Sequence, residues 1–163
     1  MSQQYFDRNG KLYTLSETSK RRPRSGAFGI ARAHNKYLLL WSEEAPDTPE
    51  VPGGGIDEGE DVYEALVREF YEETGVQLPR KLIPATPFLD RVTPYYALCD
   101  HEFWDYHQRY FFINDAEAIY FEGARTTPEN GKAAWLALDE IAKETMHAAH
   151  KQALDILLQK IGG

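Results

Sequence analysis

The chain has 163 residues, a length that suits one domain of ordinary size. Apolar residues make up 42% of it and charged residues 27%, which allows a hydrophobic core. No apolar run approaches the roughly 20 residues that a membrane-spanning helix needs, and the polar start of the chain is unlike a secretory signal. The net charge of −8 disfavours binding to bulk nucleic acid, because both partners are then negative.

The chain has one cysteine, Cys99, so an internal disulfide is excluded. A protein without disulfides fits a reducing compartment, and we expect a cytoplasmic location. The residues before the cysteine, Tyr96 to Leu98, are apolar. This context favours a buried, unreactive thiol over a catalytic one.

Residues 1–24 are polar and are expected to form a lead-in that contains one possible strand, Leu12 to Ser16. Residues 25–163 are expected to form a single domain. The lead-in ends in a basic cluster, which could meet a substrate phosphate, although a solvated loop is the favoured interpretation. This cluster consists of Lys20, Arg21, Arg22 and Arg24.

Two apolar runs, Ala27–Ala33 and Lys36–Ser42, predict strands. His34 and Asn35 lie between them and indicate a hairpin. The following residues, 43–50, are acidic and contain prolines, which predicts a loop.

A helix is predicted over residues 62–74, after the glycine-rich run Pro52–Gly55. Asp61 and Glu64 have the spacing of a capping box, and Gly75 is a typical residue to end a helix. The glycines can approach a ligand closely, because they carry no side chain.

The second half of the chain predicts further strands and one more helix. Part of residues 114–132 is expected to be a loop, and the helix begins at Leu138 or His147 and ends at Ile161. Strands on both sides of a helix, with another helix at the end, indicate a mixed sheet between helices. The strands are expected near Phe88–Thr93, Tyr95–Cys99, Arg109–Ile113 and Ala134–Leu136.

Glu69, Glu72 and Glu73 fall on the same face of the first helix as Val62 and Leu66, which should pack on the core. An ordinary amphipathic helix has its carboxylates on the opposite side. Like charges at these spacings destabilise a helix, and anions are disfavoured near its C-terminus. A bound divalent cation would reverse both penalties, and Mg²⁺ prefers oxygen ligands. The alternative is a solvated acidic face.

The glycine-rich turn could also bring a backbone carbonyl to the same cation. Glu60 and Arg68 have opposite charges, so they could pair and hold this loop against the helix.

This segment resembles the Nudix hydrolase (MutT-like) family. The family motif is Gly, five residues, Glu, seven residues, Arg-Glu, a hydrophobic residue, any residue, Glu-Glu, any residue, Gly and an apolar residue. Phe70 departs mildly, because that position is more often aliphatic. The matching residues are Gly54, Glu60, Arg68, Glu69, Phe70, Glu72, Glu73, Gly75 and Val76.

The resemblance implies an α/β fold of the Nudix type, an α/β/α sandwich with a mixed β-sheet between helices. It also implies hydrolysis of a diphosphate bond in a nucleoside triphosphate, ADP-ribose, another nucleotide sugar or a dinucleoside polyphosphate. The expected cofactor is Mg²⁺ or Mn²⁺, the partner is a small nucleotide, and a homodimer is possible. The implied metal ligands are Glu69, Glu72, Glu73 and the carbonyl of Gly53, with Gly54, Glu60, Arg68 and Gly75 in support.

A carboxylate is needed as general base, and Glu69 and Glu129 are the candidates, with Glu122 a weaker third. A cluster of aromatic residues lies in mid-chain, and one or two of them could stack on the nucleotide base. The cluster consists of Tyr95, Tyr96, Phe103, Trp104, Tyr106 and Tyr110.

Three other functions compete. An isomerase resembling isopentenyl-diphosphate isomerase would need Cys99 as a catalytic thiol. A sensor would bind a nucleotide without turnover, although such domains often lose the motif carboxylates. An RNA-decapping enzyme is disfavoured by the acidic charge.

Overall fold

A computed structural model describes residues 3–162. Within this range, no helix has the length and apolar composition to cross a membrane. The strands are β1 (Gln4–Phe6), β2 (Leu12–Thr14), β3 (Arg21–Ala33), β4 (Lys36–Ser42), β5 (Ala45–Glu50), β6 (Gly53–Gly55), β7 (Leu89–Ala97), β8 (Glu102–Ile113), β9 (Arg125–Thr126) and β10 (Lys132–Ala137). The helices are α1 (Val62–Thr74), α2 (Leu138–Ile141) and α3 (Ala148–Gly162), with 3₁₀ turns at Arg80–Leu82 and Glu117–Ile119.

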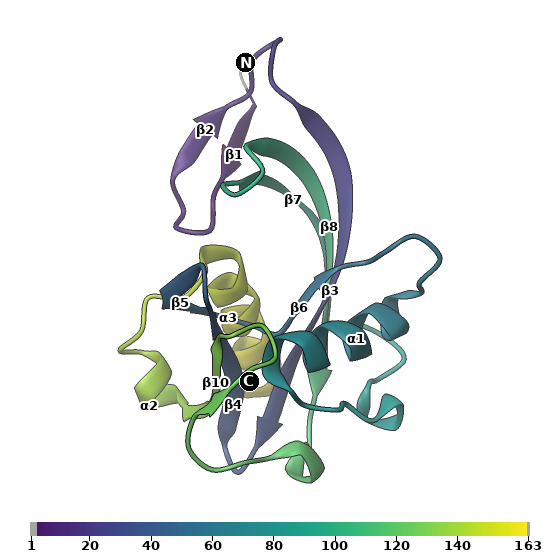
Figure 1. Ribbon diagram of the computed structural model, residues 1–163, viewed down its shortest axis with the longest axis vertical. Helices are drawn as coiled ribbons and strands as arrows, with labels where there is room; N and C mark the ends of the chain where they lie inside the picture. Colours follow the sequence, from purple (N-terminus) through teal and green to yellow (C-terminus); the bar gives the residue numbers. More distant parts are fainter. Residues whose placement is uncertain (1–2, 163) are drawn as a thin grey trace.

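The strands form a mixed sheet in the order β2-β1-β7-β8-β3-β4-β10-β9, with β5 on β4 and β6 on β3. The pairs β3–β8 and β1–β7 are parallel, and the other pairs are antiparallel. Figure 1 shows α1 and α3 near the middle of this sheet. The strands β3, β7 and β8 extend past these helices and curve toward β1 and β2.

Alternate residues of β3 and β4 build two separate cores. Ala31 and Leu38 pack in the core that contains the α1 residues, whereas Ile30 and Leu39 pack in the core that contains Leu154 of α3. Successive strand residues point to opposite faces, so an uninterrupted apolar strand requires cover on both sides. The helices supply it, which confirms the expected α/β/α sandwich.

The hairpin and the first helix form where the sequence predicts them. His34 and Asn35 have φ angles of 53° and 58°, as a two-residue β-hairpin turn requires. Asp61 and Glu64 form the capping box of α1. Gly75 ends the helix with φ 74°, a left-handed conformation that glycine adopts without penalty.

The predicted loop at residues 43–50 is wrong, because Ala45–Glu50 is strand β5. This strand pairs with β4 through Leu40–Glu50 and Ser42–Ala45 and shifts register between them. It lies at an edge of the sheet, where prolines are tolerated because the missing N–H has no ladder partner.

Several strands are longer than the sequence predicts. Three residues of the basic cluster expected to be a solvated loop, Arg21, Arg22 and Arg24, lie in the first part of β3, which pairs in parallel with β8. The two strands predicted around Pro94 are one strand, β7, and β8 begins at Glu102 rather than Arg109. Polar and aromatic residues are mixed along β8 without a regular alternation, so a local window of sequence does not reveal its full length.

The lead-in, residues 1–24, contains β1 and β2, and β3 begins within it. The strand expected at Leu12–Ser16 is β2, which ends at Thr14. At the other end of the chain, the sequence predicts that the second helix begins at Leu138 or His147. Helix α3 begins at Ala148, one residue after the later of these two positions. The division into a lead-in and a domain stays a prediction.

Candidate active site

Glu69 and Glu73 of α1 face the glycine-rich strand β6, while Glu72 contacts Arg68. The backbone N–H of Gly53 donates to Oε1 of Glu73 at 2.7 Å. A Cβ on Gly54 would lie 2.7 Å from the carboxyl carbon of Glu69, closer than real Cβ contacts allow. Glycine at residue 54 therefore leaves room for this carboxylate in its present position, because it carries no side chain.

Arg68 connects the loop before α1 to its carboxylates. Its guanidinium donates to both carboxylate oxygens of Glu60, at 2.7 and 2.9 Å, and to the carbonyl of Gly55 at 2.9 Å. It also donates to Glu69 at 3.0 Å and to Glu72 at 3.2 Å. The predicted pair of Glu60 and Arg68 is present, and it fixes the loop against the helix.

Carboxylates are concentrated and partly buried here. Burial raises the pKa of Glu69 to about 7, opposed by the neighbouring Arg68. Burial also raises the pKa of Glu73 well above its ordinary value, and the charges of Glu50, Glu69 and Glu129 add to this effect. The fold therefore holds carboxylates where their ionised forms lack compensation from solvent.

Within residues 3–162, no three His, Cys, Asp or Glu side chains are arranged as a ready-made group of metal ligands. Arg68 accounts for this locally, since its guanidinium lies against Glu69 and Glu72, while Glu73 turns to Gly53. The donor chemistry nevertheless fits a divalent cation: oxygen ligands of high charge, poorly solvated, on one helix face. The role of these residues as metal ligands stays a prediction.

The two late-loop candidates for the general base lie in different surroundings. Glu129 lines a cavity of about 270 Å³ together with Glu73, and its charge raises the pKa of both Glu69 and Glu73. Glu122 accepts a hydrogen bond from Tyr120 instead, and its charge acts on Lys36. The structure therefore brings Glu129 to the glutamates of α1 and gives Glu122 other neighbours.

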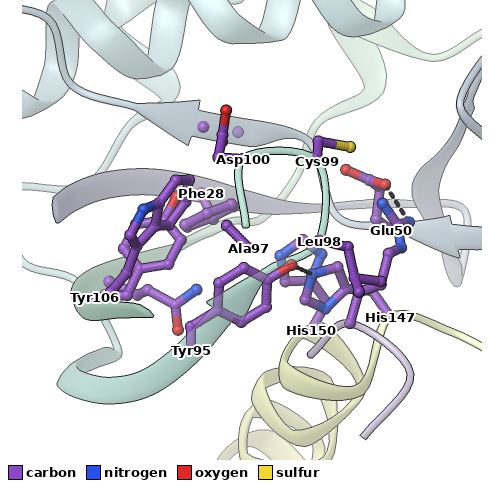
Figure 2. A pocket seen from close by; sticks show the side chains of 15 residues that line it. Phe28, Glu50, Tyr95, Ala97, Leu98, Cys99, Asp100, Tyr106, His147 and His150 are labelled. Carbon is purple, nitrogen blue, oxygen red and sulfur yellow. Dashed lines mark hydrogen bonds and ion pairs between the residues drawn. The ribbon is translucent and has the colours of Figure 1, made fainter. Parts of the chain in front are cut away.

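A second cavity, of about 220 Å³, adjoins the glycine-rich strand (Figure 2). Gly53 and Gly54 form part of its wall. Tyr95, Trp104 and Tyr106 line it, and these residues belong to the aromatic cluster expected to supply a base-stacking surface. The cavity is therefore an aromatic pocket next to the carboxylates.

The lining of the aromatic pocket contains residues that sequence reasoning missed. Arg8 donates to Glu50 at 2.7 Å, and both residues line the pocket. His147 and His150 lie beside them, and the tyrosine hydroxyl of Tyr95 lies 3.3 Å from Nε2 of His147 (Figure 2). Arg8 and His147 are far apart in sequence, and no local pattern indicates that they meet.

Cys99 is exposed, so the expectation of a buried thiol is wrong. It follows the end of β7 and lies in the turn to β8, where it lines the aromatic pocket (Figure 2). Tyr96 and Ala97 belong to the strand, whereas Leu98 and Cys99 lie in the turn after it.

Comparison with known proteins places this geometry in a family. The NUDIX domain family matches residues 20–157. The RNA pyrophosphohydrolase of Rhizobium meliloti (strain 1021) is 41% identical over 54 residues, which cover 26% of this chain and 32% of that protein. The putative 8-oxo-dGTP diphosphatase of Bacillus subtilis (strain 168) is 42% identical over 50 residues, which cover 31% and 34%. The chain thus spans about a third of the curated relatives that it matches.

A solved structure of the same family has a similar fold. The crystal structure of a MutT NUDIX hydrolase from Burkholderia pseudomallei matches with a TM-score of 0.59 and 26% identity, covering 82% of this chain and 97% of that one. The family match extends over most of the chain, and it includes the complete motif from Gly54 to Val76 on α1 and the loop before it. This protein belongs to the Nudix family.

Proposed function

We propose that this protein hydrolyses a diphosphate bond in a nucleoside diphosphate derivative, with Mg²⁺ or Mn²⁺ as cofactor. One observation carries the proposal: Glu69, Glu72 and Glu73 share one face of α1, and Glu69 and Glu73 lie against the glycine-rich strand, whose Gly53 and Gly54 line an aromatic pocket. The names of the relatives, a pyrophosphohydrolase and a putative diphosphatase, support the same reaction class.

The proposed metal ligands are the carboxylates of Glu69, Glu72 and Glu73 and the carbonyl of Gly53. When bound, a divalent cation neutralises charge on the diphosphate and lowers the pKa of a water molecule. Arg68, held by Glu60, keeps Glu69 and Glu72 in place and partly balances their charge. Gly54 leaves room for Glu69, and Gly75 ends the helix two residues after Glu73.

A carboxylate oxygen accepts the proton of the attacking water. Glu69 and Glu129 are the two candidates, since Glu69 faces Gly54 and Glu129 shares a cavity with Glu73. The base of the nucleotide stacks in the aromatic pocket, where Trp104 and Tyr106 offer flat apolar surfaces. The diphosphate would then extend from the pocket past Gly54 to the glutamates.

The test is turnover of a substrate panel by the purified protein with Mg²⁺ or Mn²⁺. The panel contains nucleoside triphosphates, 8-oxo-dGTP, ADP-ribose, another nucleotide sugar, a dinucleoside polyphosphate and a 5′-triphosphate RNA. A Glu72→Gln/Glu73→Gln variant is compared with a Glu144→Gln control, because Glu144 is exposed and lies after α2. We expect the wild type and the control to release a nucleoside monophosphate from a small nucleotide. The double variant should not release it.

Two other outcomes would change the conclusion. Metal-dependent binding of nucleotides without turnover would make the protein a sensor. Turnover of the 5′-triphosphate RNA in preference to small nucleotides would overturn the small-molecule substrate and favour RNA decapping. We further propose that residues 25–163 form the catalytic domain after a lead-in. We also propose that the protein is a homodimer, and light scattering would test this oligomeric state.

A further inference from the structure

The basic cluster at the start of β3 divides into paired and unpaired arginines. Arg21 donates to Asp105 at 2.9 and 3.3 Å, and Arg22 donates to Glu102 at 3.0 Å. Within residues 3–162, the side chain of Arg24 has neither a hydrogen bond nor an ion pair. The charges of Arg21 and Arg22 are thus compensated by strand β8, whereas the charge of Arg24 is not.

A partly buried arginine without an acceptor is unusual in this protein. Arg8, Arg32 and Arg91 also have a buried Nε atom without a partner. Each of these three, however, donates through Nη2, to Glu50, Asn35 and the carbonyl of Ala149 respectively. Arg24 has the buried Nε atom and lacks such a bond, so its guanidinium has donors to spare.

Two neighbours fix where this guanidinium lies. It lies 5.4 Å from the ring centroid of Trp104, in a cation–π contact. It also lies so close to Gly55 that a Cβ there would overlap it. Trp104 lines the aromatic pocket, and Gly55 follows Gly54, which lies next to the carboxylate of Glu69. Arg24 therefore contacts one residue of the pocket wall, Trp104, and the strand that lies next to Glu69.

The other arginines near the site are already committed to protein acceptors. Arg68 is bound to Glu60, Glu69 and Glu72, and Arg8 is bound to Glu50. A diphosphate that reached the glutamates from the pocket would bring negative charge past Arg24. The planar guanidinium suits phosphate, since it can donate two parallel hydrogen bonds.

We propose that Arg24 binds a phosphate group of the substrate. Its guanidinium is held against Trp104, and it occupies the space that Gly55 leaves free because it has no side chain. The proposal rests on the proposed function, because it takes a diphosphate as the substrate. Trp104 is itself fixed, as its Nε1 donates to Glu102 at 3.1 Å.

The test compares Arg24→Gln with Arg22→Gln. Arg22 is a matched control, because it lies on the same strand and its guanidinium is 5.5 Å from the same tryptophan ring, but Glu102 already accepts from it. Binding of inorganic pyrophosphate is measured by calorimetry, and KM and kcat are measured on the best substrate of the panel. Thermal melting is recorded for each variant.

We expect Arg24→Gln to raise the Kd for pyrophosphate and the KM about tenfold or more, since a charge-assisted hydrogen bond is lost. Arg22→Gln should stay within about twofold, and Arg24→Lys should recover part of the loss because it restores the charge. Pyrophosphate binding by Arg24→Gln within about twofold of wild type would overturn the proposal, and so would a wild type that binds no pyrophosphate at millimolar concentration.

The two proposals can fail separately. If wild type cleaves nothing in the panel but binds pyrophosphate through Arg24, the anion site stands and the hydrolase function fails. If wild type cleaves a nucleotide and Arg24→Gln has an unchanged KM and an unchanged Kd for pyrophosphate, the hydrolase function stands and the anion site fails.

Discussion

The imidazole rings of His147 and His150 stack with their centroids 3.9 Å apart and their planes 8° apart. Both side chains are buried, and Nδ1 of His150 accepts a hydrogen bond from the backbone N–H of Val51 at 3.0 Å. This bond joins the start of α3 to the segment that leads into Gly53. A neutral histidine pair therefore supports the strand that carries the active site.

This pair predicts a pH-dependent contribution to stability. Burial lowers the pKa of His147 to about 3, with Arg8 adding to the effect, and burial lowers the pKa of His150 well below its ordinary value. The unfolded chain takes up these protons near pH 6.5, whereas the folded protein does so only at much lower pH. Stability from each histidine is thus lost as pH falls from about 6.5, by about 2 kcal/mol at pH 5.

The His147→Gln variant isolates this contribution. The raised pKa values of Glu69 and Glu73 act in the opposite direction, because the folded protein takes up those protons first, and they are common to both proteins. The cost of the substitution in free energy of unfolding should therefore be about 2 kcal/mol smaller at pH 5 than at pH 7.5. His34→Gln, at an exposed residue, is the control. If His147→Gln lowers the free energy of unfolding by the same amount at both pH values, the prediction is contradicted.

Gly54→Ala should lower activity about tenfold or more with a smaller effect on folding. The added Cβ would meet the carboxylate of Glu69, which is the end of a flexible side chain and can move away. Enzyme assays and thermal melting measure the two effects. In a Gly54→Ala/Glu69→Gln double variant the losses should be less than multiplicative, because both changes act on one carboxylate. Fully multiplicative losses would mean that Gly54 acts elsewhere.

Glu60→Gln should lower the free energy of unfolding by about 1–2 kcal/mol, because Arg68 loses its closest carboxylate. Activity should fall as well, since Arg68 then holds Glu69 and Glu72 less firmly. Chemical denaturation and the metal concentration needed for half-maximal rate report these effects. The exposed neighbour Glu58 is the matched control, and equal behaviour of Glu58→Gln and Glu60→Gln would refute the prediction.

The general base is identified by comparing Glu129→Gln with Glu69→Gln. Loss of the base should lower kcat about a hundredfold or more with little change in KM. Loss of a metal ligand should also raise the Mn²⁺ concentration required. Glu44→Gln, in the same cavity, is the control, and its kcat should stay within a few-fold of wild type. If the kcat of Glu129→Gln also stays within a few-fold, Glu129 is not the base.

Cys99→Ala should keep full hydrolytic activity. The thiol is exposed and lines the aromatic pocket, in the turn between β7 and β8, and the proposed chemistry does not use it. Turnover of the panel and of isopentenyl diphosphate would be measured for both proteins. Isomerisation of isopentenyl diphosphate by wild type, lost in Cys99→Ala, would instead support the isomerase alternative.

The sequence by itself determined the parts that depend on neighbours along the chain. The capping box of Asp61 and Glu64, the left-handed end of α1 at Gly75 and the two-residue turn at His34 all depend on interactions over a few residues. The shared face of the glutamates follows from helical spacing alone. For these features, local stereochemistry is sufficient.

The tertiary structure decided what depends on pairing between distant segments. Residues 45–50 became a strand because β4 offers an edge, and the arginines at the start of β3 acquired different roles because only some of them face acceptors on β8. The approach of Arg8 to Glu50 and of Glu129 to Glu73 likewise required the folded sheet. Such contacts depend on register and sheet order, which the spacing of residues along the chain does not specify.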